Sequence, residues 1–376
     1  MVEEYYKADY DILAMTDHGV IKNGWTSERE TNGIFNKFRK VYPMSEENYE
    51  RITKGLDRGG RGMTDIRGGI ECNMAVISKT HVNGYFTTYG QGEWGIENDY
   101  RTAPVEIEKA GGYSVLNHVG DWVDSSRFPH RSHWNVYIAY FAGIFIDCPS
   151  CLGMEIVNNT DRVTRGDREL WDELLQVVIP KGRNIWAFAD DDSEKLNEVG
   201  RSFEFFVLPE NNEANVKKAM KDGNFFAASK YYKTTDGVGD FDGDGNVPLV
   251  TDIKVDQKAN TITVATDPTR DCRVIEWIAD GKVIATGNTI DLNDYEKDLG
   301  CYIRFQMKGS GGVTYSQPFE LQYKGRIDKP VPSWVLWVFK TEAGQKFMKF
   351  YHSHSFALGA LIAEKIRILI EDNIKK

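Results

Sequence analysis

A short apolar run near the start of the chain constrains its fold more than any other feature. The run is Ile12-Leu-Ala-Met15, and it ends abruptly in Thr16-Asp-His-Gly19. A continuous apolar run of this length is typical of a strand that is covered on both faces in a parallel sheet. Because α/β proteins carry their chemically active side chains at the carboxyl ends of such strands, His18 is the first candidate functional residue.

Length and composition limit the classes of protein to which the chain can belong. It has 376 residues, of which 41% are hydrophobic, and this length predicts two domains. The net charge of -10 and the pI of 5.4 argue against a nucleic-acid-binding protein. The longest apolar runs, at residues 335–339 and 356–363, are far shorter than the ~20 residues that a membrane-spanning helix needs. We therefore expect no membrane span.

The first residues carry no basic segment followed by an apolar one, so no signal peptide is visible. They predict instead a short amphipathic helix that leads straight into the strand at residue 11. We therefore expect the N-terminus to be incomplete, and a signal peptide to be absent for that reason. A secreted or periplasmic location is favoured over a cytoplasmic one, while the oligomeric state is left open.

Strand-like and helix-like segments alternate from residue 69 to about residue 230. The expected strands are residues 69–77, 113–118, 153–157, 184–189 and 224–228. The expected helices are residues 104–110, 167–178 and 213–221. Such alternation predicts βα units and hence an α/β fold.

Several side chains that can ligate metals stand near the ends of these strands. Each has an ordinary structural explanation when taken alone, such as a core histidine, a helix cap or a surface carboxylate. Taken together, imidazoles and carboxylates are the ligands of zinc, manganese or iron, and the set is larger than one ion requires. The candidate ligands are His18, Glu71, His81, His118, Asp192 and Glu194.

The order of the motifs that carry these residues resembles the PHP (polymerase and histidinol phosphatase) family of metal-dependent phosphoesterases. The resemblance covers roughly residues 1 to 230 and is closest to members with a small β-sandwich after the catalytic domain. The motifs are Ile12-Leu-Ala-Met-Thr-Asp-His18, Gly69-Ile-Glu71, His81-Val-Asn-Gly84, Val115-Leu-Asn-His118, Glu155-Ile-Val-Asn-Asn159, Trp171-Asp-Glu-Leu-Leu175 and Ile185-Trp-Ala-Phe-Ala-Asp-Asp-Asp-Ser193.

The resemblance implies a distorted (β/α)7 barrel of the PHP type, with two or three divalent ions at the carboxyl ends of its strands. It implies that every candidate except Glu194 matches a family ligand. It also implies that Asp17 matches a catalytic residue lining the site. One departure is that Asp192-Ser-Glu194 stands where the family closes with Asp-x-His. The carboxylate of Glu194 is a harder ligand than imidazole and favours manganese or magnesium over zinc there.

A second departure is that the family's first strand, which ends in His-x-His, would precede Met1. The chain does contain His352-Ser-His354 near its far end, and a circularly arranged domain could use that pair as ligands. The alternative is an N-terminally incomplete barrel whose tail, residues 326–376, is an unrelated helix. We expect the second arrangement, because the Ser-Asp-Gly that follows the family's histidines is missing and residues 358–370 have helical apolar spacing.

Three arginines are candidates for binding an anionic substrate. Arg58 and Arg61 lie in a glycine-rich loop before the Glu71 strand, and Arg162 follows the strand that contains Glu155. Guanidinium groups suit phosphate recognition because they donate paired hydrogen bonds. The alternative is that these segments are ordinary surface loops.

The pattern changes after residue 235. Residues 236–249 form an acidic, glycine-rich linker in which Asp240, Asp242 and Asp244 have the spacing of a calcium loop. The bidentate glutamate expected at the twelfth position is Thr251, so calcium binding competes with a solvated linker as the explanation. Residues 250–325 show short alternating strands with turn signals, which predict a small immunoglobulin-like β-sandwich.

These observations predict a metal-dependent hydrolase that cleaves a small phosphorylated substrate, with residues 1–235 as its catalytic domain. The ligand chemistry supports the metal, whereas the phosphate ester is implied by the resemblance. The alternative is a degenerate, non-catalytic barrel that serves as a binding module, which the missing first motif and Glu194 favour.

Overall fold

The computed structural model describes residues 1–27, 43–72, 79–92, 99–125, 127–326, 328, 341–344 and 346. The expected helical tail, including His352 and His354, lies almost entirely outside these residues. The arrangement of the two chain ends therefore stays a prediction.

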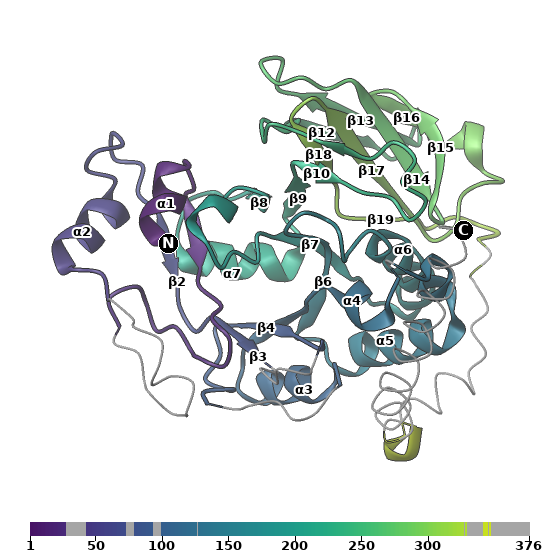
Figure 1. Cartoon of the computed structure of the whole chain (residues 1–376). Coiled ribbons are helices and arrows are strands. Elements are labelled where there is room, and N and C mark those ends of the chain that lie inside the picture. Colours follow the sequence, from purple (N-terminus) through teal and green to yellow (C-terminus); the bar gives the residue numbers. More distant parts are fainter. Residues whose placement is uncertain are drawn as a thin grey trace, which may run out of the picture.

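Seven α-helices and nineteen strands are formed by the described residues (Figure 1). The helices are α1 (Val2–Lys7), α2 (Glu46–Lys54), α3 (Thr102–Lys109), α4 (Val119–Val123), α5 (Asn135–Asp147), α6 (Asp167–Val178) and α7 (Glu213–Asp222). The first ten strands are β1 (Ile12–Ala14), β2 (Thr64–Ile66), β3 (Ile70–Cys72), β4 (Val82–Tyr85), β5 (Tyr113–Leu116), β6 (Cys151–Asn158), β7 (Trp186–Asp190), β8 (Ser202–Phe206), β9 (Phe225–Ser229) and β10 (Tyr231–Tyr232). The others are β11 (Phe241–Asp242), β12 (Val250–Asp256), β13 (Thr261–Thr266), β14 (Val274–Ala279), β15 (Lys282–Thr286), β16 (Thr289–Asp291), β17 (Tyr302–Gly309), β18 (Gly312–Tyr315) and β19 (Phe319–Glu320).

The sheet that carries most of the candidate ligands has five strands in the order β3-β4-β5-β6-β7. Strands β5, β6 and β7 are parallel, as the alternation of strands and helices predicts. Strand β4, however, runs antiparallel to both β3 and β5. Strands β1 and β2 form a separate parallel pair.

The predicted (β/α)7 barrel is wrong. The described residues form five sheets, and none of the five is closed. A parallel barrel requires every neighbouring pair of strands to be parallel, whereas β3, β4 and β5 are antiparallel neighbours and β8 is antiparallel to β9. Strands outnumber helices among the described residues, and β8 and β9 share a sheet with strands that follow residue 250, so a simple α/β fold followed by a separate sandwich does not describe the chain.

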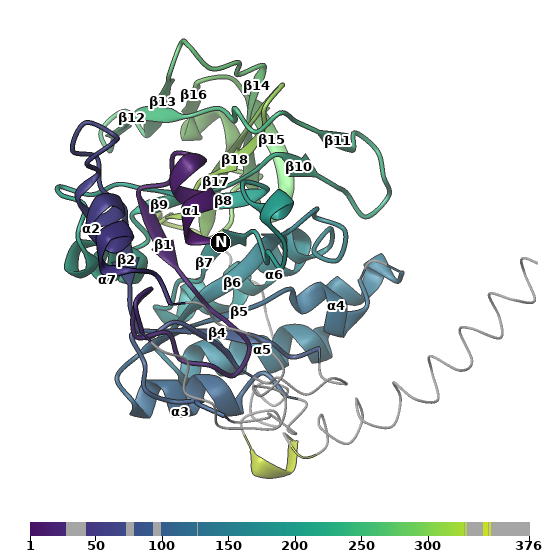
Figure 2. The same cartoon turned by 60° about the vertical axis from the view of Figure 1, so that its left-hand side comes forward.

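The largest sheet has seven strands and runs from the middle of the chain to its later part. Its main path has the order β15-β14-β17-β18-β9-β8, and these six strands are labelled in Figure 2. Strand β19 pairs with β17. Strand β9 therefore joins the strands that follow residue 250 through its antiparallel pairing with β18. A three-stranded sheet, β12-β13-β16, shares an apolar cluster with this sheet that includes Ile262, Trp277 and Phe305. The expected domain limits at residues 235, 249 and 325 stay predictions.

The main apolar core lies between the five-stranded sheet and helices α5 and α6. Helix α5 is apolar on almost every side, and its buried residues run from Tyr137 to Phe145. Strand β6 is buried along its whole length. This burial is the largest source of stability for the sheet that positions the site, because removing apolar surface from water dominates folding. No helix within the described ranges has the length and apolar character that crossing a membrane requires.

A buried ion pair joins helix α6 to the large sheet. The Asp172 carboxylate accepts hydrogen bonds from Arg304 Nε at 2.7 Å and from Arg304 Nη2 at 2.6 Å. It also accepts one from the Tyr302 hydroxyl at 2.7 Å. All three side chains are buried, so each charge depends on its partner.

We expect Asp172→Ala to destabilise the protein by about 3–5 kcal/mol, because it leaves the Arg304 guanidinium buried without a counter-charge. Thermal melting followed by circular dichroism measures the effect. The matched control is Asp252→Ala, which removes an exposed carboxylate from β12. Equal melting temperatures for the two variants would contradict the proposed role of the ion pair.

Candidate metal centre

Four of the predicted ligands come together from four separate segments. Glu71 lies in the middle of β3. His18 follows β1 and forms an isolated parallel β-bridge with Glu71. His81 immediately precedes β4, and His118 follows β5 as the N-cap of α4. Strand ends that are neighbours in space therefore bring these polar side chains to one place.

Glu71 is the centre of this cluster. Its Oε2 lies 2.8 Å from Nδ1 of His18, and its Oε1 lies 3.1 Å from Nδ1 of His81. Nε2 of His118 is 3.8 Å from Glu71 Oε1 and 3.2 Å from Nδ1 of His81. The Asn117 side-chain amide donates to the same Oε1 at 3.1 Å. One buried carboxylate is thus surrounded by three imidazoles and an amide.

The electrostatics of Glu71 favour its charged form. Burial alone would raise its pKa, but hydrogen bonds from His118, His18 and His81 outweigh that effect and hold the pKa well below its ordinary value. Conversely, burial disfavours the charged form of His118, but the hydrogen bond and charge of Glu71 raise the pKa of this imidazole. A divalent ion bound there would replace the protons on the imidazoles as the positive charge that balances the Glu71 carboxylate.

The backbone of His118 is held in an unusual conformation. Its φ is 30° and its ψ is 51°, in the left-handed region that residues with a side chain adopt at a cost in energy. Its N–H donates a hydrogen bond of 2.6 Å to Oε2 of buried Glu155. Gly120, two residues later, donates its N–H to Oδ2 of Asp167 at 2.9 Å. These contacts fix the turn that directs the imidazole toward Glu71.

Asp192 lies beside the cluster, whereas Glu194 does not join it. Asp192 is exposed, has a φ of 47°, and is close enough to Glu71, His118 and His18 to interact electrostatically with each. Glu194 is also exposed, and its N–H donates to Oε2 of Glu198 at 2.9 Å. Residue 194 lies beyond β7 and is not among the residues whose ligand atoms converge within the described ranges, so its role as a ligand stays a prediction.

No family model, curated protein or solved structure matches this chain. The site is therefore judged by its geometry. His18, Glu71 and His81 each offer a ligand atom, and these atoms all lie within 4.8 Å of one another. In addition, Nδ1 of His118 is buried and has no hydrogen-bond partner in the part of the chain that the structure describes. Two imidazoles and a carboxylate form a ligand set for zinc, manganese or iron, so the residues fit one divalent ion.

Two lysines that the sequence analysis did not single out lie within four residues of a ligand histidine along the chain. Lys22 Nζ is 3.1 Å from Oδ2 of Asp17, so the predicted catalytic carboxylate is held in an ion pair. The backbone carbonyl of Asp17 also accepts the N–H of Glu71 at 3.2 Å. Lys79, two residues before His81, pairs with Asp121 at 2.8 Å. The sequence signal that could have identified both residues is their position within four residues of a ligand histidine.

The contacts of the predicted substrate-binding arginines are with residues outside the cluster. Arg58 donates to the carbonyl of Tyr10 at 2.7 Å and pairs with Asp9 at 2.7 Å. Arg61 pairs with the same Asp9 carboxylate at 2.5 Å. Arg162 is exposed, and its carbonyl accepts a hydrogen bond from Arg165. Arg58 and Arg61 therefore attach their loop to the chain after α1, and substrate binding by these residues stays a prediction.

The aspartates of the expected calcium loop make local contacts. Asp240 Oδ1 accepts the N–H of Thr234 at 2.8 Å, and Asp242 Oδ1 pairs with Lys233 at 2.5 Å. Asp244 Oδ1 accepts the N–H of Asn246 at 2.9 Å. Within the described ranges, the cluster around Glu71 is the group whose ligand atoms converge on one point. Calcium binding at residues 240–244 stays a prediction.

We expect Glu71→Gln to weaken binding of Mn²⁺ or Zn²⁺ by at least about tenfold, because the neutral amide removes the one buried negative charge among the imidazoles. Isothermal titration calorimetry of the metal-stripped protein measures the affinity. Glu194→Gln is the matched control and should bind the ion as the unaltered chain does. Loss of affinity in Glu194→Gln, or its retention in Glu71→Gln, would contradict this assignment of the ligands.

Proposed function

We propose that the chain is a metal-dependent hydrolase of phosphate esters, acting at the cluster around Glu71. The observation that carries the proposal is that ligand atoms of His18, Glu71 and His81 all lie within 4.8 Å of one another. The resemblance to PHP phosphoesterases supports the reaction class, because these residues stand in that family's motif order. The substrate expected from that resemblance is a small phosphorylated molecule.

A bound divalent ion would polarise a phosphoryl oxygen and make hydroxide available near neutral pH. The chain's own residues hold the ion and orient the substrate. His18 and His81 supply neutral nitrogen ligands, and Glu71 supplies the negative charge. His118 is positioned against them by the hydrogen bond from its N–H to Glu155.

Two lysines on the segments that carry His18 and His81 suit an anionic substrate. Lys22 is held beside Asp17 and Lys79 beside Asp121, so each lysine is fixed close to a segment that carries a ligand histidine. Phosphate oxygens are strong acceptors of charge-assisted hydrogen bonds from such ammonium groups. We propose that Lys22 and Lys79 bind the phosphoryl group that the metal activates.

The second candidate function is a binding module without catalysis. It is favoured by the size of the converging ligand set, which comprises three residues among those described and suits one ion. A single ion can hold an anionic ligand but lacks the second metal that clamps both oxygens of an in-line displacement. Metal stoichiometry and turnover together distinguish the two functions.

We expect hydrolysis of p-nitrophenyl phosphate to require added Mn²⁺ or Zn²⁺ and to stop on addition of EDTA. In Glu71→Gln, kcat/KM should fall by at least about 100-fold, because a weakly held ion no longer stabilises the transition state. Release of p-nitrophenol measures the rate, with Glu194→Gln as the matched control and p-nitrophenyl acetate as a substrate without phosphorus.

Tight metal binding without turnover of p-nitrophenyl phosphate or bis(p-nitrophenyl) phosphate would favour the binding module. Metal-independent turnover that Glu71→Gln leaves unchanged would exclude the proposed mechanism. Faster cleavage of the acetate than of both phosphates would change the reaction class from phosphate ester to carboxyl ester hydrolysis.

A further inference from the structure

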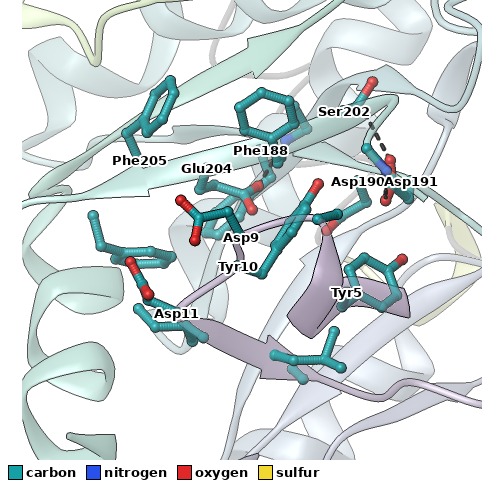
Figure 3. Close-up of a pocket in the computed structure, with 18 of the residues that line it drawn as sticks. Tyr5, Asp9, Tyr10, Asp11, Phe188, Asp190, Asp191, Ser202, Glu204 and Phe205 are labelled. Atoms are coloured by element: carbon teal, nitrogen blue, oxygen red, sulfur yellow. Dashed lines mark hydrogen bonds between the residues drawn. The ribbon is translucent and has the colours of Figure 1, made fainter. Parts of the chain in front are cut away.

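A cavity of about 700 Å³ lies beside β1, β7 and β8 and is separate from the four residues of the metal cluster. It is lined by residues from the N-terminal segment on one side and by β7, β8 and α7 on the other (Figure 3). None of His18, Glu71, His81 and His118 is among its lining residues. Its volume is that of a small-molecule site.

One wall of the cavity is apolar. It is formed by large side chains that include Phe188 of β7, Phe205 and Phe206 of β8, Leu208 and Met220. Phe188 is buried, and its ring lies 4.8 Å from that of Phe225. A wall of this kind takes a hydrocarbon chain or ring, because burying apolar surface is favourable and non-directional.

The carboxyl group of Glu204 lies within this apolar surrounding. Its Oε1 accepts the N–H of Ala189 at 2.8 Å, and this hydrogen bond holds the Glu204 side chain of β8 against the backbone of β7. Burial raises the pKa of Glu204 well above its ordinary value, and the charges of Asp190 and Asp191 raise it further, against the opposing effect of the Ala189 amide. Its other oxygen, Oε2, has no hydrogen-bond partner within the described ranges.

A second polar group, the hydroxyl of Tyr10, also lacks a partner. This oxygen is buried and makes no hydrogen bond with any of the residues described. The ring is held edge-on between Tyr5, at 5.0 Å, and Phe203, at 6.0 Å. Figure 3 shows Tyr10 and Glu204 facing the same space. A buried hydroxyl without a partner costs free energy that a ligand able to donate or accept a hydrogen bond would recover.

Among the other charged residues of the lining, Asp190 has a buried Oδ2 without a hydrogen-bond partner in the described ranges, and the rest are engaged. Asp191 accepts three backbone N–H groups, from residues 200, 201 and 202. Asp9 and Asp11 pair with Arg58. Arg270, the one basic residue among the lining residues that the structure describes, donates to the carbonyl of Val247 and lies over the ring of Phe205. No basic residue of the lining is therefore paired with Glu204.

We propose that this cavity binds a primary amine that carries an apolar chain or ring. Its ammonium group donates hydrogen bonds to Glu204 Oε2 and to the Tyr10 oxygen. Its apolar body packs against Phe188 and Phe205. The positive charge of the ammonium group would favour the ionised form of Glu204, whose pKa is otherwise raised by burial. An anionic molecule would be repelled by Asp190 and Asp191, and a purely apolar molecule would leave both polar groups without a partner.

The test uses the full chain and 4-phenylbutylamine as the probe, with binding measured by isothermal titration calorimetry. The neutral 4-phenylbutan-1-ol and the anionic 4-phenylbutyrate have the same apolar body. We expect the amine to bind at least about tenfold more tightly than the alcohol, because a hydrogen-bonded charge contributes more than a neutral donor. We expect the acid not to bind.

Two variants locate the interaction. Glu204→Gln keeps an oxygen for the Ala189 N–H but removes the charge, and it should weaken amine binding at least about tenfold while leaving the alcohol unaffected. Tyr10→Phe removes only the hydroxyl and should weaken amine binding to a smaller degree. Glu296→Gln is the matched control and should bind as the unaltered chain does. Glu296 is exposed and lies between β16 and β17.

Equal affinities for the amine and the alcohol would overturn the proposal, as would amine binding that both Glu204→Gln and Tyr10→Phe leave unchanged. Circular dichroism melting of each variant shows whether the protein is folded, and either variant alone suffices if the other does not fold. The measurement needs no metal and no turnover, so its outcome is independent of the proposed hydrolase activity.

Discussion

The candidate site depends on one buried carboxylate, Glu71, and its neighbours. A carboxylate in the protein interior is stable only when positive or hydrogen-bonding groups compensate for its lost hydration. Here His18, His81 and His118 and the amide of Asn117 provide that compensation. Because these groups come from different segments, folding of the sheet and assembly of the ligand set are the same event. A divalent ion bound there would add to the stability of the folded chain.

Helix α6 connects this site with the rest of the molecule. Near its start, Asp167 accepts the N–H of Gly120 and so supports the turn that carries His118. Farther along, Asp172 binds Arg304 of β17 through two hydrogen bonds. The same helix therefore contacts both the segment that bears a metal ligand and the large antiparallel sheet. Both aspartates are buried, so their partners are required for the helix to pack where it does.

The sequence identified four of the residues that meet, because polar side chains at the ends of apolar strands are an unusual pattern with few structural explanations. Glu194 stands outside the group that converges in the described ranges, and spacing along a loop does not determine which side chains face the site. Glu155 lies in a strand that is buried along its whole length, but its partner, the N–H of His118, is a backbone group that no sequence pattern specifies. The cavity beside Tyr10 depends on the packing of distant segments and leaves no local signal.

The overall fold was predicted less well than the site. Periodicity indicates where strands are but not their direction or their neighbours, and the antiparallel placement of β4 between β3 and β5 is what separates this sheet from a parallel barrel. Strand β9 was placed correctly in the sequence, yet it pairs with β18, more than 80 residues away along the chain. Long-range pairings of this kind are set by the fit of whole surfaces and not by local propensity.

The central claim is that Glu71 and its imidazoles hold a divalent ion, and anomalous X-ray diffraction from crystals grown with Mn²⁺ tests it most directly. The account predicts an anomalous peak about 2.0–2.2 Å from a nitrogen of His18, a nitrogen of His81 and an oxygen of Glu71. X-ray fluorescence establishes independently that the crystal contains the metal. Crystals that contain manganese but show no peak at this cluster, or show their main peak elsewhere, would contradict the claim.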